Sequence, residues 1–166
     1  GKENLKFFAQ GVMPATDFDG NLLLASADSL ALSPNGHGGS LKALIDSGSI
    51  NEMARRGIEH VSYFQVDNPL VSVINPLFIG LHDLQSSDMS SRSLTKTGPF
   101  ENLGNFVSTG DRISIIEYSD LPEEKALEKE EDGRIKYRAG SPAIHVLRRD
   151  FIEQFASGEI KLPYHR

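Results

Sequence analysis

Residues 33–66, SPNGHGGSLKALIDSGSINEMARRGIEHVSYFQV, decide the fold of this chain. The stretch begins as a glycine-rich loop and passes directly into apolar residues at helical spacing. A capping box, S-x-x-E, then predicts a second helix, which a glycine ends. A run of β-branched and aromatic side chains follows and predicts a strand. The expected elements are a loop over 33–40, a helix with the apolar residues Leu41, Leu44 and Ile45, a helix over 49–57, and a strand over 58–66.

Outside this stretch, helical and strand patterns continue to alternate along the chain. Asp19 and Gly20 are typical of a hairpin turn, and Pro76 suits the first turn of a helix. Because the loops after the strands are polar and rich in glycine, we expect an α/β fold with ligands at the carboxyl ends of the strands. The other expected elements are strands over 5–10 and 135–137, a turn over 14–20, a hairpin over 105–118 turning at 109–111, and helices over 76–84, 121–131 and 143–155.

The composition narrows the class of protein. The 166 residues carry a formal net charge of −6, are 39% hydrophobic and 24% charged, and include no cysteine. The lack of cysteine excludes disulfides, thiolate zinc sites and a thiol nucleophile. The acidic balance argues against nucleic acid as a partner, and no stretch approaches the ~18 apolar residues that span a membrane. We expect a soluble, cytoplasmic protein with the length of one domain, with neither a nucleic-acid nor a membrane partner, and of an oligomeric state that the sequence does not indicate.

The glycine-rich loop over 34–39 is the first candidate for chemistry. Glycines allow close approach of the backbone to a ligand, and N–H groups at the start of the following helix attract an anion. His37, inside the loop, can donate a hydrogen bond to a phosphate oxygen. The loop has neither the Lys-Ser/Thr ending of a P-loop nor the spacing of a dinucleotide fingerprint. By itself it is equally compatible with a flexible connection.

The second candidate is Asp67, which comes directly after the expected strand over 58–66 and precedes Asn68. A carboxylate at a strand end suits a hard cation such as Mg²⁺, which needs only one or two protein carboxylates when phosphate oxygens complete its shell. The alternative is a plain turn, which an isolated Asp-Asn-Pro forms more often than a cation site.

Five motifs follow one another along the chain: FFAQ (7–10), SPNGHGG (33–39), VDNPLVSVINPLFIG (66–80), TKTGPFENLGNF (95–106) and IIEYSDL (115–121). These motifs and their order resemble the eukaryote-type UDP-sugar pyrophosphorylases, and most closely their UDP-N-acetylglucosamine pyrophosphorylase branch. The resemblance covers about residues 7–166. It implies part of a nucleotidyltransferase Rossmann-like (GT-A-type) core with a mixed sheet flanked by helices. It also implies transfer of UMP from UTP to a sugar 1-phosphate with Mg²⁺, giving a UDP-sugar and pyrophosphate.

The resemblance also assigns roles to individual residues. Gln10 matches the glutamine that reads the uracil edge, and Gly36 matches a backbone contact to the nucleotide. His37 is expected near the α-phosphate as a catalytic and nucleotide-binding residue, and Asp67 is expected to bind the metal and to act in catalysis. The expected sugar-binding residues are Asn68, Gly104, Glu117, Tyr118 and Ser141.

Three positions depart from the branch or have open roles. His37 stands where the amino-sugar branch has Asn and the glucose branch has His. Ser141 aligns with a sugar-contacting Asn, and Ser offers less hydrogen bonding to an N-acetyl group. Both differences favour a glucose-like or unassigned sugar over strict N-acetylhexosamine specificity. Lys96 is interpreted either as a phosphate partner or, preferably, as a surface lysine that supports its loop.

The family's glycine-rich activating loop, which would hold the UTP phosphates, is not found in these 166 residues. A C-terminal segment with a phosphate-contacting lysine is not found either. We therefore expect residues 1–166 to be the central part of a uridylyltransferase catalytic domain, with little or no turnover alone. The alternative is a non-catalytic module of the same ancestry that binds a nucleotide sugar or serves as a scaffold.

Overall fold

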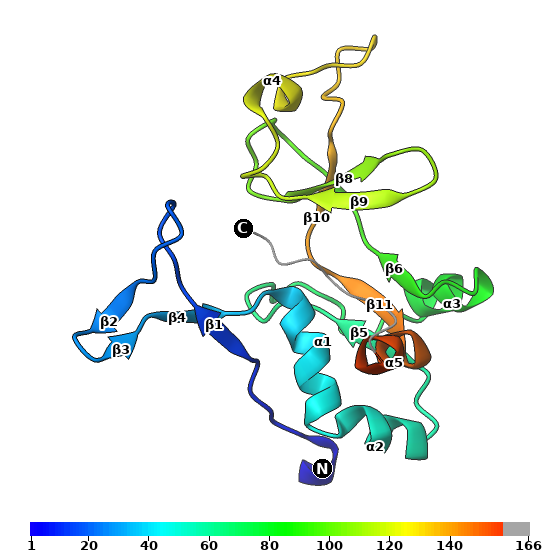
Figure 1. The fold of residues 1–166 in the computed structure, drawn as a ribbon. Helices are drawn as coiled ribbons and strands as arrows, with labels where there is room; N and C mark the ends of the chain where they lie inside the picture. The colour runs from blue at the N-terminus through cyan, green and yellow to red at the C-terminus, as the bar shows by residue number, and fades with distance from the viewer. Residues whose placement is uncertain (158–166) are drawn as a thin grey trace. The chain divides into compact units, whose positions relative to one another are not determined.

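The computed structural model describes residues 1–157, which divide into two compact units (Figure 1). Unit 1 comprises Gly1–Glu59 together with the chain from Arg148 onward, and unit 2 comprises His60–Leu147. No helix in the described part of the chain is long and apolar enough to cross a membrane. The expected site residues are divided between the units: Gln10, Gly36 and His37 lie in unit 1, and Asp67, Asn68, Gly104, Glu117, Tyr118 and Ser141 lie in unit 2.

Unit 1 combines short antiparallel strand pairs with helices. β1 pairs with β4, with Val12 opposite Pro34, and β2 pairs with β3. The turn expected over 14–20 is confirmed, because the Asp17 carboxylate accepts hydrogen bonds from the backbone of the turn and Gly20 has a φ of +86°. The elements are the 3-10 helix η1 (Lys2–Asn4), β1 (Val12–Pro14), β2 (Leu24–Ser26), β3 (Ser29–Leu30), β4 (Leu32–Pro34), α1 (His37–Asp46), α2 (Ser49–Arg55) and α5 (Arg149–Ser157).

The core of unit 1 lies where α1, α2 and α5 pack together. Leu44 of α1, Ile50 of α2 and Ile152 of α5 are buried there, and Ile152 is fully inaccessible. Arg149 joins α5 to the end of the first segment, because its backbone N–H donates to the carbonyl of Glu59 at 2.8 Å. Segments that are distant in the sequence thus form one small hydrophobic core.

Unit 2 contains a four-stranded sheet in the order β7-β10-β8-β9 and a three-stranded sheet in the order β5-β11-β6. The hairpin of β8 and β9 confirms the expected hairpin, with Gly110 at its turn (φ +82°). The helix expected over 76–84 is also confirmed, and the Asn75 side chain caps it. The elements are β5 (His60–Tyr63), α3 (Pro76–Leu84), β6 (Met89–Ser91), β7 (Leu94–Thr95), β8 (Gly104–Ser108), β9 (Ile113–Ile116), α4 (Glu123–Ala126), β10 (Ala139–Ser141) and β11 (His145–Arg148).

The helix expected over 143–155 is wrong in its first half. Ala143 has a φ of +53°, and the chain then forms β11, which pairs with β6 so that His145 lies opposite Ser91. Only from Arg149 onward does the chain become helical, as α5. The apolar residues that favoured a long helix are therefore shared between a buried strand and a shorter helix.

The charged helix expected over 121–131 is limited to α4, Glu123–Ala126. The chain then reverses near Gly133, and Lys129 and Ile135 form an isolated antiparallel bridge. The strand expected over 135–137 is reduced to that bridge. Four residues are enough for one helical turn, whereas a longer charged helix has no apolar face that packing stabilises.

The segment over 5–10 is extended but forms no strand, and the strand over 58–66 is limited to β5. The capping box at Ser49 is also wrong. Gly48, in the left-handed conformation, precedes α2 with no side-chain cap, and the Ser49 hydroxyl instead lies 2.7 Å from that of Ser47. The helix does end before Gly57, as expected. Helices and sheets together confirm the α/β class.

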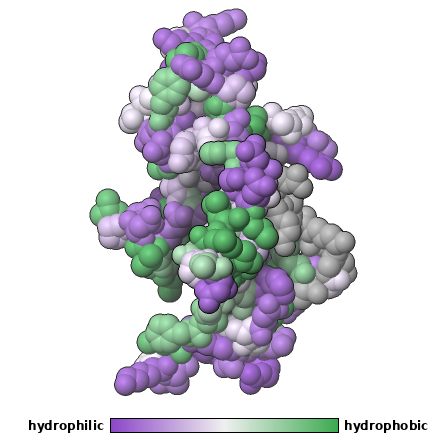
Figure 2. Space-filling view, turned by 60° about the vertical axis from the view of Figure 1, so that its left-hand side comes forward, coloured by the Kyte–Doolittle hydropathy of each residue, from purple (hydrophilic) through white to green (hydrophobic). Residues whose placement is uncertain are grey.

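Large apolar side chains are exposed on both units, and Figure 2 shows apolar groups among polar ones on one face of the molecule. Phe7 in unit 1 is 91% exposed, and Leu70 in unit 2 is 93% exposed. Few large side chains in residues 1–157 are fully buried. Hydrogen bonds therefore do much to hold the candidate site residues in position.

Candidate functional site

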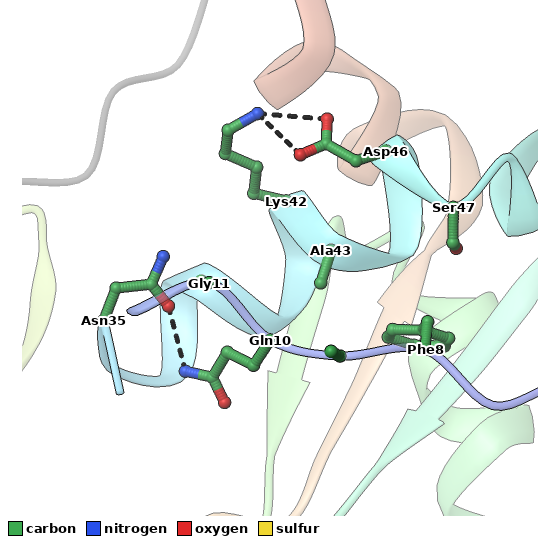
Figure 3. Close-up of a pocket in the computed structure, with 10 residues that line it drawn as sticks. Phe8, Gln10, Gly11, Asn35, Lys42, Ala43, Asp46 and Ser47 are labelled. Atoms are coloured by element: carbon green, nitrogen blue, oxygen red, sulfur yellow. Dashed lines mark hydrogen bonds and ion pairs between the residues drawn. The ribbon is translucent and has the colours of Figure 1, made fainter. Parts of the chain in front are cut away.

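In unit 1, Gln10 lies beside the glycine-rich loop (Figure 3). Its side-chain amide Nε2 donates to Oδ1 of Asn35 at 3.1 Å and to the carbonyl oxygen of Gly36 at 2.5 Å. The Asn35 backbone N–H donates to the carbonyl of Gly11 at 3.1 Å. Two segments that are 25 residues apart in the sequence are therefore joined at the two positions that the resemblance connects with the nucleotide.

Asn35 fills the space between two glycines. A Cβ added to Gly39 would lie 1.7 Å from Oδ1 of Asn35, and one added to Gly11 would lie 2.7 Å from its Nδ2. Contacts this short do not occur between atoms that are not bonded, so both positions leave room only for glycine while Asn35 keeps its place. The pattern of glycines is therefore explained in part by the packing of Asn35.

Gly36 precedes α1 with a φ of +80°, a conformation that side chains with a Cβ rarely adopt. The helix begins at His37, earlier than expected, so Gly39 is in its first turn and is buried. The first turn contains no acidic residue. Its N–H groups and the positive end of the helix dipole are thus suited to an anion. His37 is exposed at this end of the helix.

A hollow of about 370 Å³ lies alongside Gln10 and α1. Figure 3 shows Lys42 and Asp46 on one edge of it, joined by an ion pair of 2.8 Å. One wall of the hollow is the segment over 8–11, and another is one face of α1. The residues that line it are Phe8, Ala9, Gln10, Gly11, Asn35, Gly39, Lys42, Ala43, Asp46 and Ser47.

In unit 2, three of the expected sugar-binding residues lie together on the four-stranded sheet. Ser141 of β10 is directly opposite Gly104 of β8, and Asn105 is opposite Ile116 of β9. Because Glu117 follows Ile116, the antiparallel register brings it next to Gly104. The side chains of residues directly opposite each other point to the same side of a sheet, so Gly104, Glu117 and Ser141 share one face.

The Glu117 carboxylate lies over Gly104. Its oxygens would be 3.7 and 3.8 Å from a Cβ at that position, and Ile115 would be only 2.8 Å from it. In residues 1–157 no hydrogen bond or ion pair uses this carboxylate, so it is available to accept hydrogen bonds from a ligand. Tyr118, the next residue, is half exposed. A carboxylate with two free oxygens suits a pair of neighbouring hydroxyl groups.

Asp67 and Asn68 lie in a turn after β5, where the backbone N–H of Asn68 donates to the carbonyl of Gln65 at 3.3 Å. Asp67 is exposed, and its carboxylate has no hydrogen-bond or ion-pair partner among the described residues. The described part of the chain contains no group of three or more His, Asp or Glu side chains that could hold a metal ion. Asp67 can therefore contribute one oxygen ligand to a cation that is otherwise coordinated by phosphate and water.

Sequence reasoning missed the residues that hold these positions. Asn35 was visible only as part of a loop, and Asn105 only as the residue after Gly104. Lys96 is not a surface lysine: it is 5% exposed, and its Nζ donates to Oδ1 of Asn105 at 2.8 Å. A short polar residue next to glycines is the signal that could have indicated Asn35, whereas no local signal indicated the burial of Lys96.

Comparisons with known proteins identify relatives of this chain. The model of the family described as UTP–glucose-1-phosphate uridylyltransferase matches residues 1–141. The UDP-N-acetylglucosamine pyrophosphorylase of Saccharomyces cerevisiae is 33% identical, over 99% of this chain and 35% of its own length. The human UDP-N-acetylhexosamine pyrophosphorylase-like protein 1 is 35% identical, over 90% of this chain and 30% of its own length. The chain therefore spans about a third of the curated relatives that it matches.

Solved structures give the same result. A crystal structure assigned as a UDP-N-acetylglucosamine pyrophosphorylase from Entamoeba histolytica has a TM-score of 0.83 and 33% identity, and the match covers 99% of this chain and 40% of that one. The corresponding enzyme of Trypanosoma brucei, at 23% identity, has a TM-score of 0.80 over 96% of this chain and 32% of its own, and shows the fold alone. The expected resemblance is confirmed. This chain belongs to the UTP–glucose-1-phosphate uridylyltransferase family and is similar to its UDP-N-acetylglucosamine pyrophosphorylases.

Proposed function

We propose that this chain is the central, nucleotide- and sugar-binding part of a uridylyltransferase, which transfers UMP from UTP to a sugar 1-phosphate. In that reaction an oxygen of the sugar phosphate forms a bond to the α-phosphorus of UTP. The bond from that phosphorus to the β-phosphate breaks, and pyrophosphate leaves with the electron pair. A UDP-sugar is the other product, and no covalent enzyme intermediate is needed.

The contact of Gln10 with Gly36 is the observation that carries this proposal. It holds the Gln10 side chain at the N-terminus of α1, where both hydrogens of Nε2 are donated to Asn35 and Gly36 and the carbonyl oxygen Oε1 can accept from a ligand. A uracil edge presents one N–H donor, and the carbonyl oxygen of an amide can accept from it. The backbone at Gly36 is open to a close ligand, and His37 follows at the helix end that attracts phosphate. We assign Gln10, Gly36 and His37 to the nucleotide, with His37 near the α-phosphate.

We assign Asn68, Gly104, Glu117, Tyr118 and Ser141 to the sugar. Support comes from the shared sheet face of Gly104, Glu117 and Ser141, and from the Glu117 carboxylate, which has no hydrogen-bond or ion-pair partner within residues 1–157. Fixed hydroxyl partners of this kind orient the sugar phosphate for attack, which lowers the entropy cost of the reaction. The hydroxyl of Ser141 is compatible with glucose and with other sugars.

We assign Mg²⁺ to Asp67. Asp67 is exposed, and within residues 1–157 its carboxylate has no hydrogen-bond or ion-pair partner, which fits a cation that needs few protein ligands. When bound, Mg²⁺ would neutralise charge on the phosphates. The chain's own contribution is to bind the nucleotide with residues of unit 1 and the sugar with residues of unit 2.

Binding of UDP-glucose and UDP-N-acetylglucosamine, measured by calorimetry with and without Mg²⁺, tests the proposal. Gln10→Ala is expected to weaken binding of either ligand about threefold to tenfold, the cost of roughly one hydrogen bond. Gln85→Ala is the matched control, because Gln85 is exposed just after α3. Equal affinities of both variants and the wild type would contradict the assignment of Gln10.

Turnover distinguishes the whole reaction from binding alone. We expect these 166 residues to bind a UDP-sugar but to form little or none from UTP and a panel of sugar 1-phosphates. Robust formation of a UDP-sugar would show that the chain is catalytically sufficient. If no UDP-sugar binds, with or without Mg²⁺, a scaffold module of the same ancestry is the better reading.

A further inference from the structure

A buried polar pair lies on the sheet face opposite Glu117. Lys96 is 5% exposed and Asn105 is inaccessible. The Lys96 ammonium donates to Oδ1 of Asn105 at 2.8 Å and to the carbonyl of Pro99 at 3.2 Å. The Asn105 amide in turn donates to the carbonyl of Ile116 at 3.2 Å. The chain of hydrogen bonds thus runs from the end of β7 across β8 to β9.

This arrangement is costly for a buried cation. Burying a charge is unfavourable unless it is paired or well hydrogen-bonded, and both acceptors of Lys96 are neutral. No ion pair formed within the described residues includes Lys96. An apolar side chain of similar length would fill the same space at lower cost. The specific property that lysine adds here is a directional hydrogen bond to Asn105.

The residues around Lys96 hold its side chain in the position from which it donates to Asn105. A Cβ added to Gly140 of β10 would lie 3.1 Å from Cγ of Lys96, so the lysine stem passes close over that glycine. The following loop is closed by Glu101, whose carboxylate accepts from the backbone N–H of Thr97 at 2.7 Å. Lys96 is therefore held from its stem to its ammonium, and the position of Asn105 is fixed with it.

The bond from Asn105 to Ile116 acts directly beside the candidate sugar residues. Gly104 precedes Asn105, and Glu117 follows Ile116. The Glu117 carboxylate lies over the backbone of Gly104. β9 ends at Ile116, so Glu117 lies just beyond the last residue of that strand. The Asn105 amide thus anchors the end of the strand that carries Glu117.

We propose that Lys96 and Asn105 are positioning residues for the sugar: from the far face of the sheet they fix the spacing between Gly104 and the Glu117 carboxylate. This inference rests on the proposed function, because it takes Gly104 and Glu117 as sugar contacts. It adds a substrate-positioning role for two residues that do not themselves touch the ligand.

The test compares a UDP-sugar with UMP, which has no sugar to position. Lys96→Met, which keeps the length of the stem, is expected to weaken binding of UDP-glucose or UDP-N-acetylglucosamine fivefold to tenfold and to leave UMP binding within twofold of the wild type. Asn105→Asp keeps the acceptor for Lys96 but loses the donor to Ile116, and we expect the same selective loss. Lys125→Met is the matched control, because this lysine is exposed in unit 2 and pairs with Glu128.

Hydrogen exchange gives a second readout that needs no ligand. The backbone amides of β8 and β9 nearest Gly104 and Ile116 should exchange faster in Lys96→Met than in Lys125→Met. An equal loss of UDP-sugar and UMP binding, or no loss of either, would overturn the inference while the proposed function stands. A wild-type chain that binds UMP but no UDP-sugar would refute the sugar assignment itself.

Discussion

Gly39→Ala adds a single methyl group, yet we expect it to lower the stability of unit 1 strongly. Gly39 is buried in the first turn of α1, and its added methyl group would lie 1.7 Å from Oδ1 and 2.3 Å from Cγ of Asn35. Asn35 is tied in place, because its Oδ1 accepts from Nε2 of Gln10 and its backbone N–H donates to the carbonyl of Gly11. The substitution must therefore displace Asn35 and break its hydrogen bond with Gln10.

Three free-energy contributions decide the size of the effect. Overpacking a filled site costs about 1–3 kcal/mol, and loss of the bond from Gln10 to Asn35 costs about 0.5–1.5 kcal/mol. Alanine in a helix regains about 0.5–1 kcal/mol relative to glycine. The net expectation for Gly39→Ala is a decrease in the free energy of unfolding of about 0.5–4 kcal/mol, with about 2 kcal/mol as the central value.

Urea unfolding followed by far-UV circular dichroism measures this quantity, and Gly80→Ala is its control. Gly80 lies in α3, is exposed, and has no atom within 4 Å of an added Cβ. We expect Gly80→Ala to increase the free energy of unfolding by about 0.5–1 kcal/mol. UDP-sugar affinity should fall only in Gly39→Ala. If the two variants had the same stability and the same affinity, the packing role of Asn35 would be refuted.

Three further predictions concern other parts of the chain. Gly104→Ala should weaken UDP-sugar binding by at least fivefold in calorimetry, because the methyl group enters the space beside the Glu117 carboxylate; unchanged affinity would contradict the sugar assignment. The hydrogen bond from Arg148 lowers the pKa of Asp150, so this carboxylate stabilises the fold above its unfolded pKa and loses that contribution as the pH falls through the folded pKa. Asp150→Asn should therefore reduce the loss of unfolding free energy that acid causes below about pH 4. The difference should be less than about 1 kcal/mol, because both side chains of the Arg148–Asp150 pair are about half exposed. An unchanged dependence of the unfolding free energy on pH would show that this pair does not contribute to stability. Asn75→Ala should lower the free energy of unfolding by about 1 kcal/mol through loss of the α3 cap, and no change in urea unfolding would rule that cap out.

Elements with strong local signals were predicted from the sequence. Proline at the first helical position and a capping Asn75 define α3, and its bounds are those expected, 76–84. Gly110 supplies the positive φ that the turn between β8 and β9 requires. In both cases the interactions that fix the element lie within a few residues of one another, so the sequence window contains the cause.

Elements whose form depends on distant partners were not predicted. Val146 and Leu147 suit a buried strand as well as a helix, and both are almost fully buried in β11. The choice is made by pairing with β6, more than 50 residues earlier in the chain. No periodicity within 143–155 carries that information. The same reason explains why residues 5–10, although apolar, form no strand in the described structure.

The candidate site shows the same limit. The motifs indicated Gln10 and Gly36 separately, but the contact between them spans 26 residues and passes beside Asn35, to which no role was given. Lys96 was expected on the surface because lysine is seldom buried. Its burial depends on the absence of a side chain at Gly140, 44 positions later, so only the folded sheet reveals it.

Both units hold their candidate ligand contacts in place with an asparagine rather than with an ion pair. Asn35 accepts from Gln10 in unit 1, and Asn105 accepts from Lys96 while donating to the backbone of β9 in unit 2. An amide carries a donor and an acceptor on one short side chain, so it can join two partners in a space that glycines leave free. A carboxylate at position 105 would lose the donor to the carbonyl of Ile116. Within residues 1–157 the carboxylates of Glu117 and Asp67 have no hydrogen-bond or ion-pair partner, so they are available to a sugar or a cation while the asparagines make the structural hydrogen bonds.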